Sequence, residues 1–321
     1  MKTYALAIAW NWEFDHDFIA GIEHECRQAG VSTYRVDPHN LHHTLADLRS
    51  GNRAFQALYD RASDADPGFL PLVQILQETA LYLINPHHRV LHAIDKATMH
   101  LEFISRGIDV PSTIILPPFN EQRTISVPAP DLEKIGSPFV IKPANTTGGG
   151  TGVVLNATLI DHVMDARQHH KNDKYLLQQT IVPKDLDGKR GWFRVYFAFD
   201  EIIPCWWDDK THRYSELTRA QEEMYDLGEL RRIVSRIREI AKLDFFSSEI
   251  ALTRDRKFVV VDYVNEVCDM RLQSRYDNGA PDAVVHRIEF LLARSVAARL
   301  REAAESRSGE SPASRKMANL P

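Results

Sequence analysis

The sequence predicts a mixed α/β protein, with a parallel α/β layer in its N-terminal part and an α+β arrangement in its C-terminal part. Strand-like and helix-like segments alternate over residues 1–85, which is typical of a parallel sheet covered by helices. Strand-like runs follow one another over 191–217, as in an antiparallel meander. The 321 residues are enough for two or three subdomains with sizeable cores.

The N-terminal part starts with an apolar run at 3–10, which predicts a buried strand. Residues 14–30 then show helical spacing, with apolar side chains at every fourth position and a glycine as the stop. A second strand is expected at 31–36, and two further strand-like runs bracket a helix over 71–79. These elements predict one small α/β domain.

The central part begins with a long amphipathic helix over 88–107, followed by a strand at 108–116. Two strands, 137–143 and 151–155, flank a glycine-rich stretch. After a helix, the run at 175–182 predicts another strand that ends in a turn.

The C-terminal part predicts the meander, a helical pair over 217–243, a hairpin over 245–266 and a last amphipathic helix over 284–305. The final residues lack aromatic and β-branched side chains, which favours disorder. The predicted domains are 1–85 (N-terminal α/β), 86–180 (central), 181–304 (C-terminal) and 305–321 (disordered tail).

Composition excludes several classes of protein. The net charge of -5 argues against a general nucleic-acid binder. Three widely spaced cysteines without a CxxC motif argue against a disulfide scaffold or a zinc site. No stretch reaches the roughly 18 apolar residues of a membrane span, and no signal peptide is apparent. We therefore expect a cytoplasmic protein without a membrane partner.

The stretch PFVIKPANTTGGGTGVVL raises the question of a phosphate site. No lysine follows the glycines, so the P-loop pattern fails, and a strand rather than a helix follows, so the dinucleotide-binding pattern fails too. What remains is a strand, a glycine loop and a strand, with Lys142 at the end of the first strand. Such a hairpin can lay backbone N–H groups over a polyphosphate.

Other residues supply partners for this loop. Lys96 precedes it on the long helix, and 175–182 has the form of a hinge that holds a nucleotide base. Glu249, Asp262 and Asn265 offer oxygen ligands on adjacent strands of one hairpin. Carboxylates and an amide, without His or Cys, suit Mg²⁺ rather than zinc.

The order of these motifs resembles the ATP-grasp superfamily. The matching segments are DKATMHLEFISRGIDVPSTIIL, the glycine stretch, YLLQQTIV, WFRVYFAF and SSEIAL…VVVDYVNE, over residues 80–300. The pattern is most similar to that of ribosomal-protein glutamate ligase and glutathione synthetase. The resemblance implies an ATP-grasp fold, with ATP held between the central and C-terminal domains. It also implies the ATP contacts Lys96, Lys142, Thr147, Gly148, Gly149, Gly150, Thr151, Gly152, Gln178, Gln179, Ile181 and Asp185.

The metal position departs from the family pattern. The resemblance assigns Mg²⁺, with Mn²⁺ as an alternative, to Glu249, Asp262 and Asn265. Relatives space the last two ligands two apart, whereas here they are three apart, so a bulge or the strand end must re-aim one of them. Glu266 and Asp269 are alternative ligands.

The resemblance gives Arg194 a catalytic place beside the transferred phosphate, together with Lys142. Aromatic and cationic side chains gather after the second meander strand, and others follow the first strand of the chain. The substrate candidates are Trp12, Asp15, Arg61, Trp207, Lys210, His212, Tyr214 and Arg271.

The resemblance implies an ADP-forming ligase that joins a carboxylate to an amine or thiol through an acyl phosphate. A kinase of the same fold and a non-catalytic ATP-binding protein are the alternatives. The expected partner is a small molecule or peptide with a carboxylate, and a homodimer is plausible for such ligases.

Overall fold

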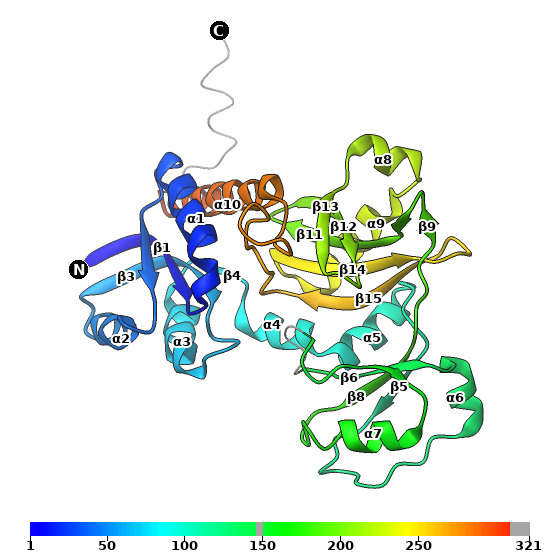
Figure 1. Cartoon of the computed structure of the whole chain (residues 1–321). Coiled ribbons are helices and arrows are strands. Elements are labelled where there is room, and N and C mark those ends of the chain that lie inside the picture. Colours follow the sequence, from blue (N-terminus) through cyan, green and yellow to red (C-terminus); the bar gives the residue numbers. More distant parts are fainter. Residues whose placement is uncertain (146–149, 309–321) are drawn as a thin grey trace. The chain divides into compact units, whose positions relative to one another are not determined.

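The computed structural model describes residues 1–145 and 150–308 and shows two compact units (Figure 1). Unit 1 holds 1–87, 198–201 and the chain from 269 onward, and unit 2 holds 88–197 and 202–268. Unit 1 has a parallel sheet, and unit 2 has antiparallel sheets. The mixed α/β class that the sequence predicts is therefore confirmed. The predicted domain boundaries stay a prediction.

Unit 1 is built on a four-stranded parallel sheet of order β2-β1-β3-β4. Its central strand β1 carries the apolar run Leu6–Ala9, fully buried, as expected for a parallel strand covered on both faces. The strands are β1 (Lys2–Trp10), β2 (Thr33–Val36), β3 (Arg53–Arg61) and β4 (Tyr82–Ile84). The connecting helices are α1 (His16–Gln28), α2 (Leu41–Arg49) and α3 (Leu70–Thr79), with the short 3-10 turns η1 (Glu13–Asp15) and η2 (Pro67–Phe69).

The last helix, α10 (Asp282–Ser308), packs against α1 in unit 1 (Figure 1). Glu289 is buried in this contact, and its carboxylate takes the space that a side chain at Gly21 would need. His286 Nδ1 lies 2.9 Å from Glu289 Oε2. Burial raises the pKa of Glu289 to about 7, although His286 opposes the shift.

The smaller sheet of unit 2 has the order β5-β8-β6-β7 and is antiparallel. Alternation along β8 places Leu177 in the core beneath the helices α6 and α7, while Leu176 packs on the other side with residues of α5. The elements are α5 (Lys96–Ser105), β5 (Thr113–Leu116), α6 (Ala129–Ile135), β6 (Phe139–Pro143), β7 (Val154–Ala157), α7 (Ile160–Ala166) and β8 (Tyr175–Gln179).

The larger sheet of unit 2 has the order β13-β12-β11-β14-β15. Helix α9 covers one face of it with an apolar stripe that includes Ile233 and Ile237. The elements are β9 (Asp185–Leu186), β10 (Lys189–Arg190), β11 (Trp192–Ala198), β12 (Glu201–Asp208), β13 (Arg213–Glu216), α8 (Arg219–Met224), α9 (Glu229–Ala241), β14 (Phe245–Leu252) and β15 (Phe258–Asn265).

One predicted helix is divided in the structure. The sequence predicts a single helix over 88–107, but the chain forms α4 (His87–Ile94) and then α5. Asp95 separates them because its backbone is extended and its carboxylate accepts a hydrogen bond from the Thr98 N–H at 2.9 Å. This N-cap starts a new helix at Lys96.

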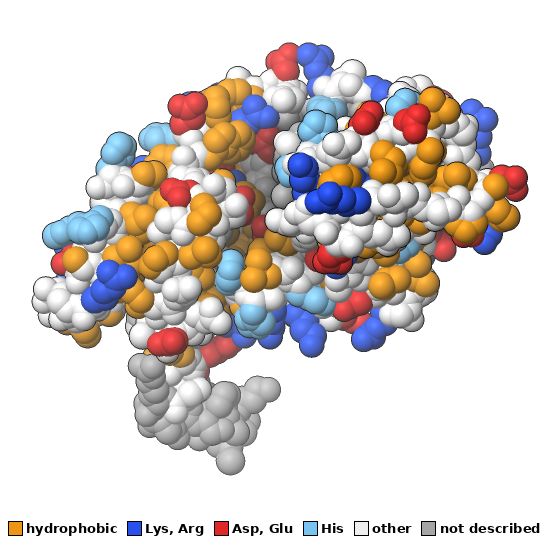
Figure 2. Space-filling model, turned by 90° about the horizontal axis from the view of Figure 1, so that it is seen from below, with side chains coloured by type: hydrophobic (Ala, Val, Ile, Leu, Met, Phe, Trp, Pro, Cys, Tyr) orange, Lys and Arg blue, Asp and Glu red, His pale blue; other side chains and the backbone are white. Residues whose placement is uncertain are grey.

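The predicted tail starts at 305, but α10 runs to Ser308, and 309–321 lie outside the described residues. Among the residues that are described, no helix is long and apolar enough to cross a membrane. On the face drawn in Figure 2, acidic and basic side chains are interspersed among apolar and neutral ones.

Candidate active site

Two lysine side chains lie near the carboxylate of Asp262, where the smaller sheet, α5 and β15 adjoin in unit 2. Lys142, near the end of β6, is buried, and its Nζ donates to the Val261 carbonyl at 3.0 Å. Lys96 Nζ lies 3.6 Å from Asp262 Oδ1. The Lys96 N–H donates to the Ala144 carbonyl at 3.1 Å, so the start of α5 is tied to the end of β6. The structure thus brings together Lys96, Lys142 and Asp262, which are far apart in sequence.

These groups form one electrostatic cluster. Burial lowers the pKa of Lys142, and neighbouring Lys96 acts in the same direction, against Asp262 and Glu249. Burial opposes ionisation of Asp262, but Lys96, Lys142 and Arg194 outweigh it and lower its pKa. Asp262 is therefore a carboxylate at neutral pH, surrounded by cations.

Arg194 and Glu249 are paired on the neighbouring strands β11 and β14. Arg194 Nη1 also reaches the Ser247 hydroxyl at 3.3 Å, and the Trp192 indole N–H donates to Glu249 Oε2 at 3.1 Å. Trp192 is not among the predicted site residues. Its position two before Arg194, on the same face of a strand, is the signal that could have found it.

A β-bulge explains the unusual ligand spacing on β15. Glu249 pairs with Asp262 and Ser247 pairs with Asn265, so two residues of β15 stand opposite one residue of β14. Tyr263 and Val264 both enter the hydrophobic core. The bulge that the three-residue spacing predicts is therefore present.

The three predicted metal ligands offer oxygen atoms, which suit a hard cation. Glu249 and Asp262 occupy opposite positions on paired strands, so their carboxylates can share one ion with the Asn265 amide. Within 1–145 and 150–308, no group of three His, Cys, Asp or Glu side chains is arranged to hold a metal. A cation here would need the amide, substrate oxygens or water to complete its shell. Of the alternative ligands, Asp269 is ion-paired to Arg271 in unit 1.

Gln178 on β8 carries a buried acceptor that is not used. Its Nε2 donates to the Tyr263 hydroxyl at 2.8 Å and to Thr113 Oγ1 at 3.1 Å. Its Oε1 is buried and has no hydrogen-bond partner in the part of the chain that the structure describes. Buried acceptors are rarely left unpaired, so this atom suits a donor on a ligand, such as the amino group of adenine.

The hinge residues follow Gln178. The Gln179 N–H donates to the Ser112 carbonyl at 2.9 Å, and Ile181 lies in the irregular segment that follows β8. Asp185, predicted to contact the ribose, is exposed and accepts from the Gly188 N–H at 2.9 Å in the β9–β10 turn.

The glycine loop is described only in its second half. Gly150 and Gly152 have φ values of 81° and 74°, a conformation that favours glycine. A Cβ at Gly152 would lie 3.0 Å from Pro143 Cγ. Thr151 lies between the two glycines. The predicted phosphate contacts Thr147, Gly148 and Gly149 lie outside the described residues.

Four of the predicted residues form an aromatic cluster beside Glu249. The Arg194 guanidinium lies 4.9 Å from the ring centre of Trp207. Tyr214 and His212 lie at 4.3 and 5.6 Å from the same ring. Lys210 stands apart from this cluster, exposed and 3.6 Å from Asp209.

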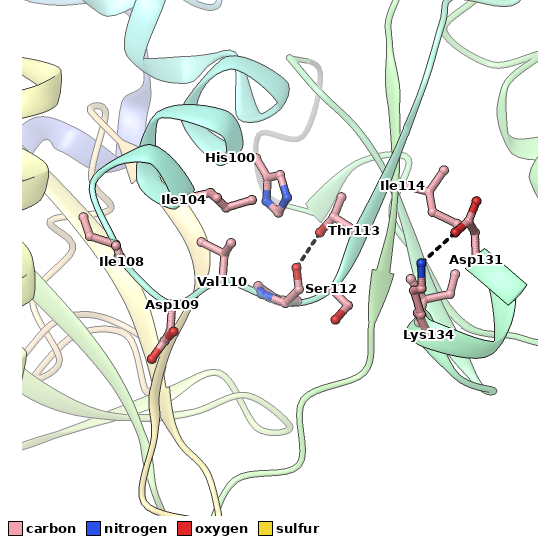
Figure 3. Close-up of a pocket in the computed structure, with 13 residues that line it drawn as sticks. His100, Ile104, Ile108, Asp109, Val110, Ser112, Thr113, Ile114, Asp131 and Lys134 are labelled. Atoms are coloured by element: carbon pink, nitrogen blue, oxygen red, sulfur yellow. Dashed lines mark hydrogen bonds and ion pairs between the residues drawn. The ribbon is translucent and has the colours of Figure 1, made fainter.

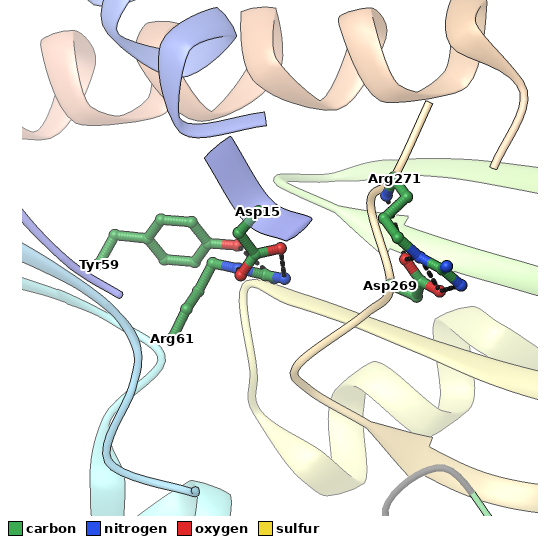
Figure 4. Close-up of polar contacts among 5 residues, drawn as sticks. All are labelled: Asp15, Tyr59, Arg61, Asp269 and Arg271. Atoms are coloured by element: carbon green, nitrogen blue, oxygen red, sulfur yellow. Dashed lines mark hydrogen bonds and ion pairs between the residues drawn. The ribbon is translucent and has the colours of Figure 1, made fainter. Parts of the chain in front are cut away.

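Unit 1 holds the remaining candidates, beginning with a closed ion pair (Figure 4). Arg61 donates two hydrogen bonds, of 2.6 and 2.8 Å, to the carboxylate of Asp15, and both side chains are 1% exposed. A substrate group could reach neither side chain without breaking this pair. The structure therefore favours a structural role over the predicted substrate contact.

Arg271 of unit 1 forks around Asp269, with its closest contact at 2.6 Å (Figure 4). Its guanidinium lies 5.5 Å from the Trp12 ring centre and 5.2 Å from that of Tyr276. Trp12 is 38% exposed, so this cluster can be approached from solvent. Trp12 and Arg271 stay predicted substrate contacts.

A pocket of about 770 Å³ opens between α5, α6 and the segment 107–114 (Figure 3). It contains neither of the predicted lysines and none of the predicted metal ligands. It borders the site through His100 and Thr113, and Figure 3 shows His100 pointing from α5 toward Thr113.

Solved structures resemble the whole chain, although no protein-family profile and no curated protein matches it. A RimK-domain ATP-grasp protein from Sphaerobacter thermophilus has a TM-score of 0.63 at 20% identity, covering 90% of this chain and 98% of its own. D-cycloserine synthetase gives 0.60 at 15% identity, with 92% and 99% covered. The ATP-grasp ligase PsnB, complexed with a minimal precursor, Mg and ADP, gives 0.58 at 13% identity, with 92% and 98% covered.

Proposed function

We propose, from the premise that this chain has the ATP-grasp fold, that it is an ATP-dependent carboxylate–amine ligase that forms ADP. Solved structures of the same fold include a synthetase and a ligase complexed with Mg and ADP. A carboxylate–thiol ligase would use the same first step.

The observation that carries this proposal is the charge cluster of unit 2. Two lysines, an arginine and two carboxylates from five separate elements converge there. Cations can neutralise phosphate oxygens, and carboxylates can hold the metal that accompanies a triphosphate. A protein that only scaffolds has no need of a buried lysine beside a second lysine.

Glu249, Asp262 and Asn265 would hold Mg²⁺, and Mn²⁺ stays an untested alternative. The chemistry that a bound ion would supply is neutralisation of the negative charge that develops on the transferred phosphate. Lys96 and Lys142 would contact the α- and β-phosphates. Gln178 would accept a hydrogen bond from the adenine amino group through its unpaired Oε1. The backbone at Gln179 and Ile181 would hold the base edge, and Asp185 the ribose.

The reaction begins with attack of a substrate carboxylate oxygen on the γ-phosphorus, which breaks the bond to the β-phosphate oxygen and releases ADP. The product is an acyl phosphate, and Arg194 would stabilise the negative charge that develops on it. An amine then attacks the acyl carbon and expels inorganic phosphate, losing one proton. The protein contributes positions and charges, and the glycine loop would exclude water.

The substrate is proposed to be a peptide or small molecule with a carboxylate. Trp207 lies against Arg194, and Tyr214 and His212 pack on Trp207, so an extended or aromatic group next to the carboxylate can stack there. PsnB is complexed with a precursor peptide, which supports including peptides among the candidates.

The test is a screen of amino acids, short peptides and dicarboxylates with Mg²⁺ and ATP, in the presence of hydroxylamine. We expect ADP release together with hydroxamate for at least one carboxylate, because hydroxylamine traps an acyl phosphate. Glu249→Gln, which keeps the shape of the side chain, is the matched blank.

Three outcomes separate the alternatives. ADP release without hydroxamate, with a phosphorylated hydroxyl product, would identify a kinase. Binding of Mg-ATP without any ADP release would identify a non-catalytic ATP-binding protein. Equal rates for Glu249→Gln and the unaltered protein would contradict the proposed metal site.

A further inference from the structure

Gln178 is part of a chain of hydrogen bonds. Starting from one end of this chain, we can assign which atom donates and which accepts in each bond. Thr113 Oγ1 lies 2.7 Å from the Pro111 carbonyl, which can only accept. The single hydroxyl proton of Thr113 is therefore used there. Toward Gln178, at 3.1 Å, the Thr113 oxygen can only accept.

It follows that the Gln178 amide presents its NH₂ group inward. One proton goes to Thr113 and the other to the Tyr263 hydroxyl oxygen at 2.8 Å. The opposite orientation would place the amide oxygen beside a Thr113 oxygen that has no proton to give. The buried Oε1 is thus left as an acceptor for a ligand.

The far end of the chain agrees with this direction. Tyr263 accepts from Gln178, so its own proton can go to His100 Nδ1 at 2.7 Å. Burial lowers the pKa of His100 to about 4, and nearby Lys142 adds to the effect, so the imidazole is neutral and Nδ1 can accept.

Tyr263 reaches Gln178 because it follows Asp262 on the opposite, core-facing side of β15. In a regular strand, residues that follow Asp262 would alternate between the site and the core. Here Tyr263 and Val264 both enter the core, and the ring of Tyr263 stacks on His100 at 5.9 Å. The bulge therefore adds Val264 to the core and brings Asn265 opposite Ser247, while Tyr263 contacts Gln178 from the core face.

We propose that Thr113, Tyr263 and His100 are positioning residues that set the polarity of the Gln178 amide and thereby make the site select ATP over GTP. The proposal rests on the proposed function. Adenine carries an amino donor at the position where guanine carries a carbonyl acceptor. An outward Gln178 Oε1 can accept from the amino group of adenine, but it would face the carbonyl oxygen of guanine with no proton between them. Leaving these two acceptors unpaired costs enough free energy for a preference for ATP of about 100-fold.

The experiment measures equilibrium binding of Mg-ATP and Mg-GTP to the full chain by calorimetry and compares the ratio of the two Kd values. Thr113→Val keeps the shape but removes the anchor, so the amide can turn, and the preference should fall about tenfold. Thr113→Ser keeps the hydroxyl and should retain the preference for ATP. Tyr263→Phe should lower this preference as Thr113→Val does.

The control is Tyr225→Phe, since the Tyr225 hydroxyl bonds Asp187 at 2.8 Å on the surface, away from Gln178. It should leave the ratio unchanged. If ATP binds but Thr113→Val and Tyr263→Phe weaken ATP and GTP equally, the positioning role is wrong and the proposed function stands. The same holds if the unaltered protein does not discriminate. If neither nucleotide binds, both proposals fall.

Discussion

The two units each hold acidic and basic side chains in close contact, yet the two arrangements differ in accessibility and completeness. In unit 1, Asp15 and Arg61 form a fork of two bonds and are 1% exposed. In unit 2, Asp262 is 32% exposed along its side chain and lies 3.6 Å from Lys96. The first pair is closed, and the second leaves oxygen atoms accessible to a ligand.

This difference in exposure and pairing indicates which charged side chains can interact with a ligand. In a buried ion pair with good geometry, each charge neutralises the other. Removing one of the two therefore lowers the free energy of unfolding. A cluster in which three cations lie near two partly accessible carboxylates, next to a buried acceptor with no hydrogen-bond partner among the described residues, can accommodate a ligand. The two units should therefore respond oppositely to mutation.

Asp15→Asn should have the largest effect on stability. It leaves the Arg61 charge buried without its partner, which costs about 3–5 kcal/mol. Urea unfolding followed by circular dichroism measures this loss. Protein that remains folded should bind Mg-ATP as before, and a specific loss of ATP binding at unchanged stability would reverse the roles of the two regions.

Asp262→Asn should reduce hydroxamate formation about 100- to 1,000-fold, because it removes a ligand of the proposed metal and the counter-charge of two lysines. The urea midpoint should change little, since the side chain is partly exposed. Glu249→Gln is the companion variant. A large drop in stability with normal turnover per folded molecule would contradict this assignment.

The two aromatic clusters give a smaller contrast. Trp207→Ala removes the ring beneath Arg194, and we expect the KM for the carboxylate substrate to rise about fivefold. Trp12→Ala, in the cluster around Arg271, should change it less. Steady-state kinetics on both variants decides the point, and a larger effect at Trp12 would place the substrate determinant in unit 1.

The smallest expected effect is on the pH dependence of stability. One titrating group in each unit should change the stability, and the two changes should run in opposite directions with pH. The pKa of His100 is lowered to about 4, so the unfolded chain binds a proton more readily and unit 2 loses stability as pH falls from 6.5 to 4. The pKa of Glu289 is raised to about 7, so its contribution in unit 1 is present below pH 4.5 and lost as pH rises toward 7.

Thermal unfolding of Glu289→Gln and of His100→Asn between pH 4 and 7.5 measures these contributions. The first variant should lose the decline toward pH 7, and the second should lose part of the decline toward pH 4, each by a few degrees at most. Parallel curves for the variants and the unaltered protein would show that neither group is linked to folding.

Much of the fold could be predicted because periodicity reports burial. The parallel strands of unit 1 and the meander of unit 2 follow from apolar runs and alternation. The division of 88–107 at Asp95 could not be predicted from amphipathicity, since both helices continue the apolar pattern and only the cap separates them.

The site shows the same limit. Lys96, Lys142, Glu249 and Asp262 come from motif order, and the structure brings them together. The role of Tyr263 could not be found, because alternation places it on the core face, opposite to Asp262, and only the structure shows that its hydroxyl contacts Gln178 from there. Asp15 and Arg61 were predicted from their place after strands, which does not reveal that they bind each other.

The most direct test of the central claim is the affinity of Lys142→Met for Mg-ATP. Methionine has a similar length but no charge, and burial lowers the pKa of Lys142, which means that its charge is costly to bury, so the fold should be unharmed or more stable. If the unit 2 cluster is the ATP site, calorimetry should show one Mg-ATP bound by the unaltered protein and an affinity about 100-fold weaker in the variant. Equal affinity in both proteins would contradict the account.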